Sequence, residues 1–420
     1  MISSSTTYSS QFELIEERSL GSSLSIQEEV ETEIALATGE CGAQQSPISA
    51  ADDWIVRSLP DVLQGEQRDK VETQGIALVY SLPRLPRLVR VNPVICEAVA
   101  ELLRNKQIPQ ATEDVSLAGL KREEVGNFFL ALVAICHQTS PRGRAPLEGY
   151  VAGILLRGWD FLAAKYHEAV ASDKGWLSPD RWRSTSEEDV RTLFHDPSLG
   201  DRLKDPDGRA ALLRNLGFVF KDRNWRHIEE LYALCDGRLA AGFPNLLGEL
   251  SRFRAYADPV RKKSLFFLSL MQNCGQWRYD DGQLLGPPID YHEVRGHLRI
   301  GTVEILDESL RLRLVRREPV DALADVAIRS AVYDAIMRVV ELSGIDASRL
   351  HYLFWNVFRS VCLHDKPQCL DILPDSNLPE RYYHLARDGG TQCGCPFRSV
   401  CSSKVKIDRL VEHVFETDYY

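Results

Sequence analysis

Five of the ten cysteines in this chain of 420 residues lie in its last 60 residues. Cys362 and Cys369 are separated by six residues, Cys395 and Cys401 by five, and 25 residues lie between the two pairs. Closely spaced thiols in a chain without a secretory signal indicate a metal site rather than disulfides. Both an iron–sulfur cluster and a structural zinc ion take four thiolates, and the absence of short C-x2-C knuckles favours the cluster. Cys393 is a fifth candidate that could replace Cys395, although the five-residue spacing favours Cys395.

A carboxylate precedes an expected helix in the segment 286–295, where two prolines and Ile289 lead into Asp290. Free backbone N–H groups and the helix dipole hold an ionised carboxylate at such a position. The group can therefore face a developing positive charge without being protonated. By itself, the pattern equally fits a plain helix N-cap.

Two lysines at the start of another expected helix, Lys262 and Lys263, are candidate nucleophiles. Burial of Lys263 beside Arg261 and Lys262 would lower its pKa and favour the free amine that a nucleophile needs. The alternative is a pair of basic residues on an exposed helix start. The sequence does not separate the two.

The cysteine spacing resembles the outer pairs of the C-x6-C-x2-C-x5-C loop that holds a [4Fe-4S] cluster in the endonuclease III type of helix-hairpin-helix DNA glycosylase. Arg359 precedes the first cysteine and Lys366-Pro367 precedes the second, as is usual in that family. Asp290 lies in an element similar to the family's proline, apolar, Asp, x, His motif. The resemblance covers residues 125–405 and implies a [4Fe-4S] cluster held by the four paired cysteines.

The resemblance also implies roles for other residues. Asp290 would be the essential carboxylate, and Lys263, with Lys262 as substitute, would form a Schiff base with the sugar. Gln138 would fill the space that a flipped base leaves in the duplex, and the alternative is a polar residue at a helix end. Trp277 and Tyr291, which flank the interval between Lys263 and Asp290, are the candidates for stacking the base.

The chain departs from the family around Lys263. The Leu-Pro-Gly-x-Gly turn of the usual hairpin is missing, and the interval from Lys263 to Asp290 is longer than usual. A degenerate hairpin also occurs in the archaeal 8-oxoguanine glycosylases, which this segment resembles, although those proteins lack the cluster.

The charge of the chain argues against a polyanionic ligand. The formal net charge is −10, which is the wrong sign for binding phosphates. Residues 1–50 hold eight Glu and one Arg, a balance of −7, and this leaves −3 for residues 51–420. A basic face therefore fits the composition but is not required by it. Without a secretory signal or a long apolar stretch, we expect an intracellular protein that does not cross a membrane.

Apolar residues at helical spacing recur from residue 123 onward and predict a mainly α, two-lobed helix-hairpin-helix glycosylase-like fold. Alternating apolar and charged residues at 301–316 predict an inserted β-hairpin instead. The predicted helices span 93–106, 125–137, 147–171, 186–195, 207–218, 225–236, 320–344 and 347–361. The expected organisation is a disordered acidic tail at 1–50, an N-terminal subdomain at 51–122, a helical domain at 123–361, a cluster loop with an insertion at 362–405, and a C-terminal tail at 406–420.

Together, these patterns predict a DNA-repair N-glycosylase, with or without lyase activity, that flips a modified or damaged base out of duplex DNA. One alternative is a glycosidase that acts on a free modified nucleoside or nucleotide, which the acidic charge and the missing hairpin turn suit. Another is a non-catalytic iron–sulfur protein that binds nucleic acid.

Overall fold

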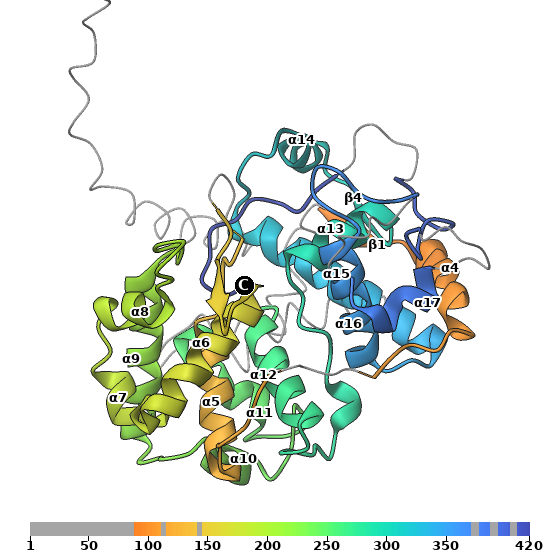
Figure 1. Cartoon of the computed structure of the whole chain (residues 1–420). Helices are drawn as coiled ribbons and strands as arrows, with labels where there is room; N and C mark the ends of the chain where they lie inside the picture. Colours follow the sequence, from red (N-terminus) through yellow and green to blue (C-terminus); the bar gives the residue numbers. More distant parts are fainter. Residues whose placement is uncertain (1–87, 111–114, 141–144, 371–377, 387–393, 404–409) are drawn as a thin grey trace, which may run out of the picture. The chain divides into compact units, whose positions relative to one another are not determined.

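Helices dominate the chain, which confirms the mainly α fold class. The computed structural model describes residues 88–110, 115–140, 145–370, 378–386, 394–403 and 410–420 (Figure 1). These residues belong to one compact unit, Pro86–Tyr420. The expected tail at 1–50, residues 51–87 of the expected subdomain and Cys393 lie outside the described residues. In the described part of the chain, no helix combines the length and the apolar character that a bilayer crossing requires.

The elements follow one another in a simple order. The longer helices are α4 (Pro93–Arg104), α5 (Arg122–Ala134), α6 (Trp159–Ser172), α8 (Glu187–Phe194), α9 (Pro206–Asp222), α12 (Lys262–Asn273), α13 (Tyr291–Ile300), α14 (Glu308–Arg316), α15 (Ala322–Ser343) and α16 (Ala347–Ser360). Short helices are α7 (Pro179–Arg183), α10 (Glu229–Cys235), α11 (Leu246–Leu250) and α17 (Tyr383–Ala386). The strands are β1 (Val89–Val91), β2 (Glu148–Val151), β3 (Ile154–Arg157) and β4 (Val303–Ile305).

Two hydrophobic cores organise these elements. The first surrounds α5, in which every residue from Val125 to Ala134 is buried. A helix that is buried on all sides belongs at the centre of its core, and the helices from α6 to α12 contribute to the same core. The second core combines α4 with α13, α15 and α16. Figure 1 shows α4 in orange beside the blue C-terminal helices, far from them in sequence.

Residues 88–110 belong to the second core. The buried face of α4 consists of Cys96, Val99, Ala100 and Leu103, at the three and four spacing of an amphipathic helix. Part of the segment that the sequence assigned to an N-terminal subdomain at 51–122 is therefore integral to the core that holds α13 and α16.

The predicted β-hairpin at 301–316 is wrong. Only Val303–Ile305 form a strand, and it pairs antiparallel with Val89–Val91. Residues 308–316 form α14, because the side chain of Asp307 accepts the N–H of Leu310 and caps the helix. Leu310 and Leu314, one helical turn apart, are the buried residues of α14. The alternating pattern of this segment also matches the four-residue spacing of a helix, and the Asp307 cap decides in favour of the helix.

The predicted helix at 147–171 is wrong in its first half. Glu148–Val151 and Ile154–Arg157 form an antiparallel hairpin, and only Trp159–Ser172 are helical. Ala152 and Gly153 form the connecting loop with φ of 50° and 79°. Positive φ at both loop residues is the signature of a tight hairpin turn. The other predicted helices are confirmed within a few residues, and Gly344 ends α15 with φ of 72°.

Candidate functional site: a thiol cavity joined to a capped carboxylate

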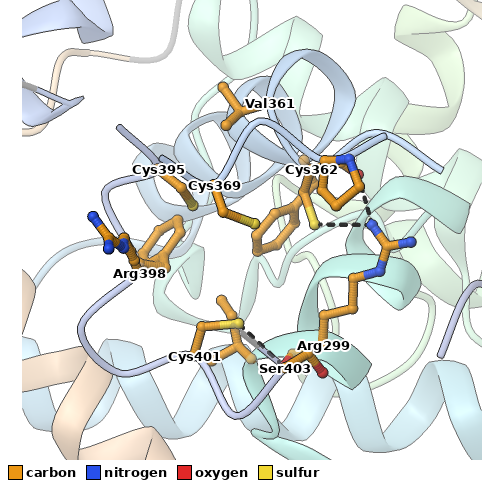
Figure 2. A pocket seen from close by; sticks show the side chains of 12 residues that line it. Arg299, Val361, Cys362, Cys369, Cys395, Arg398, Cys401 and Ser403 are labelled. Carbon is orange, nitrogen blue, oxygen red and sulfur yellow. Dashed lines mark hydrogen bonds between the residues drawn. The ribbon is translucent and has the colours of Figure 1, made fainter. Parts of the chain in front are cut away.

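The four predicted cysteine ligands, Cys362, Cys369, Cys395 and Cys401, line one cavity (Figure 2). The backbone N–H of Cys395 donates to the carbonyl of Cys369 at 3.2 Å and joins the two pairs despite the long insertion between them. The apolar part of the lining consists of Ile300, Phe358, Val361, Pro367 and Phe397. The predicted ligand set therefore converges on one partly apolar space.

The four thiols influence each other electrostatically. Burial raises the pKa of Cys395, and the neighbouring Cys362, Cys369 and Cys401 raise it further. Thiolates this close to one another need positive charge to remain ionised together. Among the described residues, no group of three or more His, Cys, Asp or Glu is positioned to hold a single metal ion, and the thiols instead surround a shared space.

Arg299 supplies positive charge at the cavity wall. Its Nη1 donates to Sγ of Cys362 at 3.3 Å, and its remaining bonds go to the carbonyls of Cys362, Leu363, His364 and Leu410. The side chain is 2% exposed, and among the described residues it has no carboxylate partner. The sulfur of Cys362 is the only side-chain acceptor among these contacts. Four cysteines, apolar walls and a buried cation fit the chemistry of a [4Fe-4S] cluster. Zinc takes the same cysteine donors, but no three of the described side chains are placed around a single ion.

Asp290 caps α13, as the sequence predicts. Its Oδ1 accepts the backbone N–H groups of His292 at 2.8 Å and Glu293 at 3.2 Å, and its Oδ2 accepts the indole N–H of Trp355 at 2.8 Å. The side chain of Glu293 accepts the backbone N–H of Asp290 in return. Three N–H donors hold the carboxylate in one orientation, and Asp290 is 9% exposed.

Helix α13 connects this carboxylate to the thiol cavity. Arg295 and Arg299 lie one turn apart on α13 and both bind the segment that begins at Cys362. Nε of Arg295 donates to the carbonyl of Cys362 at 2.8 Å, and its Nη1 pairs with Glu412 at 2.9 Å. The same guanidinium donates to Nδ1 of His292. The cysteine loop therefore braces the helix that Asp290 begins.

His292 is held neutral in this arrangement. Burial lowers its pKa to about 3, and the adjacent Arg295 contributes to the lowering, while Asp290 opposes it. Nδ1 accepts a hydrogen bond from Arg295, so this nitrogen carries no proton and the ring is neutral. The positive charge near Asp290 thus comes from arginine rather than from histidine.

Lys263 is completely buried. Its Nζ donates to the carbonyls of Ala134 at 2.5 Å and Asp418 at 2.6 Å. Burial lowers its pKa to about 7, with Lys262 as the next contribution, so the predicted shift of this amine is found. Ala134 ends α5, and one role of Lys263 is therefore to cap that helix. A neutral amine keeps two hydrogens for the two carbonyls and has one free lone pair.

Lys262, the substitute candidate, begins α12. Its Nζ lies 5.1 Å from the centre of the Phe266 ring, and its backbone N–H donates to Oδ2 of Asp258 at 2.8 Å. The side chain is buried to 9% exposure. Neither lysine is thus on an exposed helix start.

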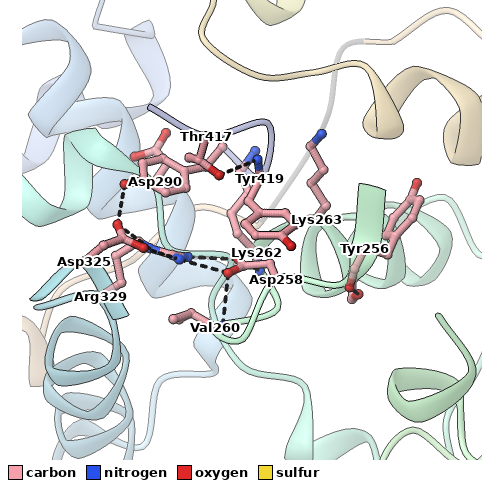
Figure 3. A network of polar contacts seen from close by, with 12 residues as sticks. Tyr256, Asp258, Val260, Lys262, Lys263, Asp290, Asp325, Arg329, Thr417 and Tyr419 are labelled. Carbon is pink, nitrogen blue, oxygen red and sulfur yellow. Dashed lines mark hydrogen bonds and ion pairs between the residues drawn. The ribbon is translucent and has the colours of Figure 1, made fainter. Parts of the chain in front are cut away.

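A buried ionic network sets the start of α12 (Figure 3). Arg329 on α15 donates to both oxygens of Asp258 at 2.8 and 2.9 Å and to Asp325 at 2.8 Å. Asp325 also bonds His413 at 2.7 Å and the Tyr420 hydroxyl. Burial alone would raise the pKa of Asp325, but the contacts with His413 and Arg329 lower it to about 2. The network connects the second core to the loop that precedes Lys262, the first residue of α12.

Replacing Arg329 with Met should strongly destabilise the protein, because it leaves two buried carboxylates without a counter-charge. We expect a loss of about 3–5 kcal/mol in the free energy of unfolding, measured by urea denaturation. Arg338→Met on the same helix is the matched control, since its ion pair with Glu341 is exposed and should contribute less than about 1 kcal/mol. Equal losses in the two variants would contradict this role of Arg329.

Gln138 is engaged within the protein. Its Nε2 donates to the carbonyl of Thr417 at 2.6 Å, and its backbone N–H donates to that of Tyr420 at 3.3 Å. Residue 138 has φ of 45°. Segment 410–420 therefore lies against two predicted site residues, Gln138 and Lys263, and the Gln138 amide is not free to enter a duplex in this conformation.

The two predicted stacking residues differ in their surroundings. Tyr291 follows Asp290, and its hydroxyl bonds Thr139 and Ser140. Burial raises the pKa of Tyr291 to about 12, and the nearby Asp290 contributes to the rise, so the phenol stays protonated. Trp277 is 2% exposed and stacks on Tyr232 at 4.8 Å within the first core. The sequence prediction that placed Trp277 in the base pocket gains no support from this packing.

The structure therefore groups Asp290, Tyr291, Gln138 and Lys263 through segments 138–140 and 417–420. Sequence reasoning missed the roles of Trp355, Arg299 and Arg329. For Arg299, a signal exists in the four-residue spacing from Arg295, which places both on one helix face. Comparisons with protein-family models and with curated proteins find no match to this chain.

Proposed function

We propose that this protein is an N-glycosidase that cleaves the bond between a base and its sugar, with Asp290 as the catalytic carboxylate. The observation that carries the proposal is the fixed orientation of the Asp290 carboxylate, which accepts three N–H groups at the start of α13. Such a group stabilises the oxocarbenium charge that develops as the base leaves, and it can orient a water molecule that attacks the sugar. The proposed fold is that of a helix-hairpin-helix glycosylase.

We assign a [4Fe-4S] cluster to Cys362, Cys369, Cys395 and Cys401. The support is the convergence of these thiols on one cavity beside the buried guanidinium of Arg299. The cluster would fasten the cysteine segments 362–370 and 394–401 onto α13, whose arginines bind the carbonyl of Cys362. Its role in the proposal is structural: it holds the helix that positions Asp290.

The geometry favours a free modified nucleoside or nucleotide over a base in duplex DNA as the substrate. The Gln138 side chain, which a duplex-reading enzyme would insert, bonds Thr417 instead. Asp418 covers the Lys263 amine, and the formal net charge is −10. Duplex DNA remains the second candidate, because the order of the motifs resembles that of the DNA glycosylases.

Incubation with both substrate classes over a range of salt concentrations separates these candidates. Binding of a polyanion declines steeply with salt, because phosphate contacts release counterions. For a free nucleoside, we expect base release that is almost independent of salt between about 50 and 200 mM. Release from duplex oligonucleotides alone, with a steep decline over that range, would reverse the substrate assignment.

Lys263 provides a separate prediction. If its amine attacks the sugar, segment 417–420 has to move away from it, and borohydride should trap a covalent adduct. Trapping should increase as the pH rises through about 7, where burial places the pKa of Lys263, because only the neutral amine attacks. Lys263→Gln should lose the adduct, whereas persistence in Lys263→Gln and loss in Lys262→Gln would assign the role to Lys262. Absence of any adduct, with base still released, would mean that water is the nucleophile.

A further inference from the structure

The carboxylate of Asp290 has one side-chain donor among its described contacts, and it comes from another helix. Nε1 of Trp355 on α16 donates to Oδ2 of Asp290 at 2.8 Å, while Oδ1 accepts only backbone N–H groups. The backbone donors belong to α13 itself and accompany any N-capping residue. The indole bond is therefore the part of this arrangement that helix capping does not explain.

The indole is itself held in place. The guanidinium of Arg359 lies 4.7 Å from the centre of the Trp355 ring and bonds Asp160 on α6 at 3.1 Å. The His292 ring meets the indole edge-on, with ring centres 6.5 Å apart. Asp160 is on a helix of the first core, and Trp355 is on a helix of the second. The orientation of the N–H is thus fixed from both cores.

We propose that Trp355 is a positioning residue of the glycosidase site: its indole N–H holds one oxygen of the Asp290 carboxylate in place, and the Arg359–Asp160 pair holds the indole. This inference rests on the proposed function. Together with the backbone N–H groups on Oδ1, the indole bond on Oδ2 holds the carboxylate in one rotamer. Catalysis depends on groups of this kind being arranged before the reaction begins.

Trp355→Phe tests the proposal, since it keeps an aromatic ring for Arg359 and removes the N–H. We expect kcat to fall on the order of tenfold to a hundredfold with little change in KM. The acidic limb of the pH–rate profile should move to higher pH, because the carboxylate loses a donor that favours ionisation. The charged and titratable groups around Asp290 that stay constant in this variant are Tyr291, His292, Glu293, Arg295, His351, Arg359 and Glu412.

Trp225→Phe is the matched control, because Trp225 packs against Phe220 in the first core, and this variant should keep both kcat and the pH profile. Arg359→Met is the second variant. It keeps the indole N–H but frees the ring, so we expect a loss of a few-fold in kcat and a shift of the acidic limb in the same direction. Arg359→Met also tests the proposal if Trp355→Phe does not fold.

An unchanged pH profile in Trp355→Phe and Arg359→Met would overturn the proposal, even if kcat falls. The outcome is distinguishable from failure of the proposed function. If Asp290→Asn is inactive while Trp355→Phe behaves as the wild type, only the role of Trp355 is refuted. If the wild-type protein releases no base, the proposed function itself is refuted.

Discussion

Cys362→Ala should yield a colourless protein, whereas the wild-type protein purified without oxygen should be brown, with a broad absorption near about 400 nm from sulfur-to-iron charge transfer. Cys362 lines the cavity together with the other three cysteines and accepts a bond from Arg299. The substitution removes one of the four proposed ligands and the side-chain acceptor of Arg299. We therefore expect loss of iron together with lower stability of residues 362–401, measured by metal analysis and by proteolysis.

Cys235→Ala is the control for this prediction. Cys235 is a buried thiol of the first core, where burial raises its pKa to about 11, so it stays protonated and packs as an apolar residue. The variant should keep its iron and its colour and lose only about 1 kcal/mol or somewhat more of stability. If the wild-type protein is colourless and holds one zinc ion per chain, the cluster assignment is wrong and the cavity is a zinc site.

Asp290→Asn should abolish base release while the protein remains folded. Asn has nearly the size of Asp and caps helices almost equally well, so the bonds from His292 and Glu293 to residue 290 can persist. The negative charge that opposes the oxocarbenium ion is lost. We expect kcat to fall on the order of a hundredfold or more with substrate binding retained, measured by single-turnover release of the base.

Asp307→Asn is the matched control, because Asp307 caps α14 in the same way, through a bond from the N–H of Leu310. Its activity should remain at the wild-type level. Near-normal release by Asp290→Asn would show that the carboxylate is only a helix cap. Another group of the protein would then have to carry the reaction.

Local sequence signals predicted the positions that depend on a helix start. Asp290 and Lys262 both lie where the helices α13 and α12 begin, and Gly344 ends α15. In these cases, the deciding contacts are within a few residues in the sequence. The cysteine spacing likewise predicted the thiols that share a cavity, although 25 residues separate the pairs.

Contacts between distant segments could not be derived in this way. The Trp355 indole meets Asp290 across 65 positions, and Arg329 meets Asp258 across 71. Each of these side chains also fits an ordinary core or surface position when only its neighbours in sequence are known. The two errors in secondary structure have a related cause: at 301–316 and 147–157, a cap at Asp307 and a two-residue turn at Ala152–Gly153 override the hydrophobic pattern.

Mass-spectrometric detection of free base and of the matching sugar product tests most directly whether this protein cleaves N-glycosidic bonds through Asp290. The substrates are a panel of modified nucleosides, their 5′-phosphates and duplex oligonucleotides with modified bases, each incubated with wild-type protein and with Asp290→Asn. With the wild-type protein, we expect at least one member of the panel to give free base and an equimolar sugar product, which is the free sugar from a nucleoside, the sugar phosphate from a nucleotide and an abasic strand from a duplex. With Asp290→Asn, we expect none above background. Equal release by the two proteins, or no release from any substrate by iron-loaded wild-type protein, would contradict this assignment.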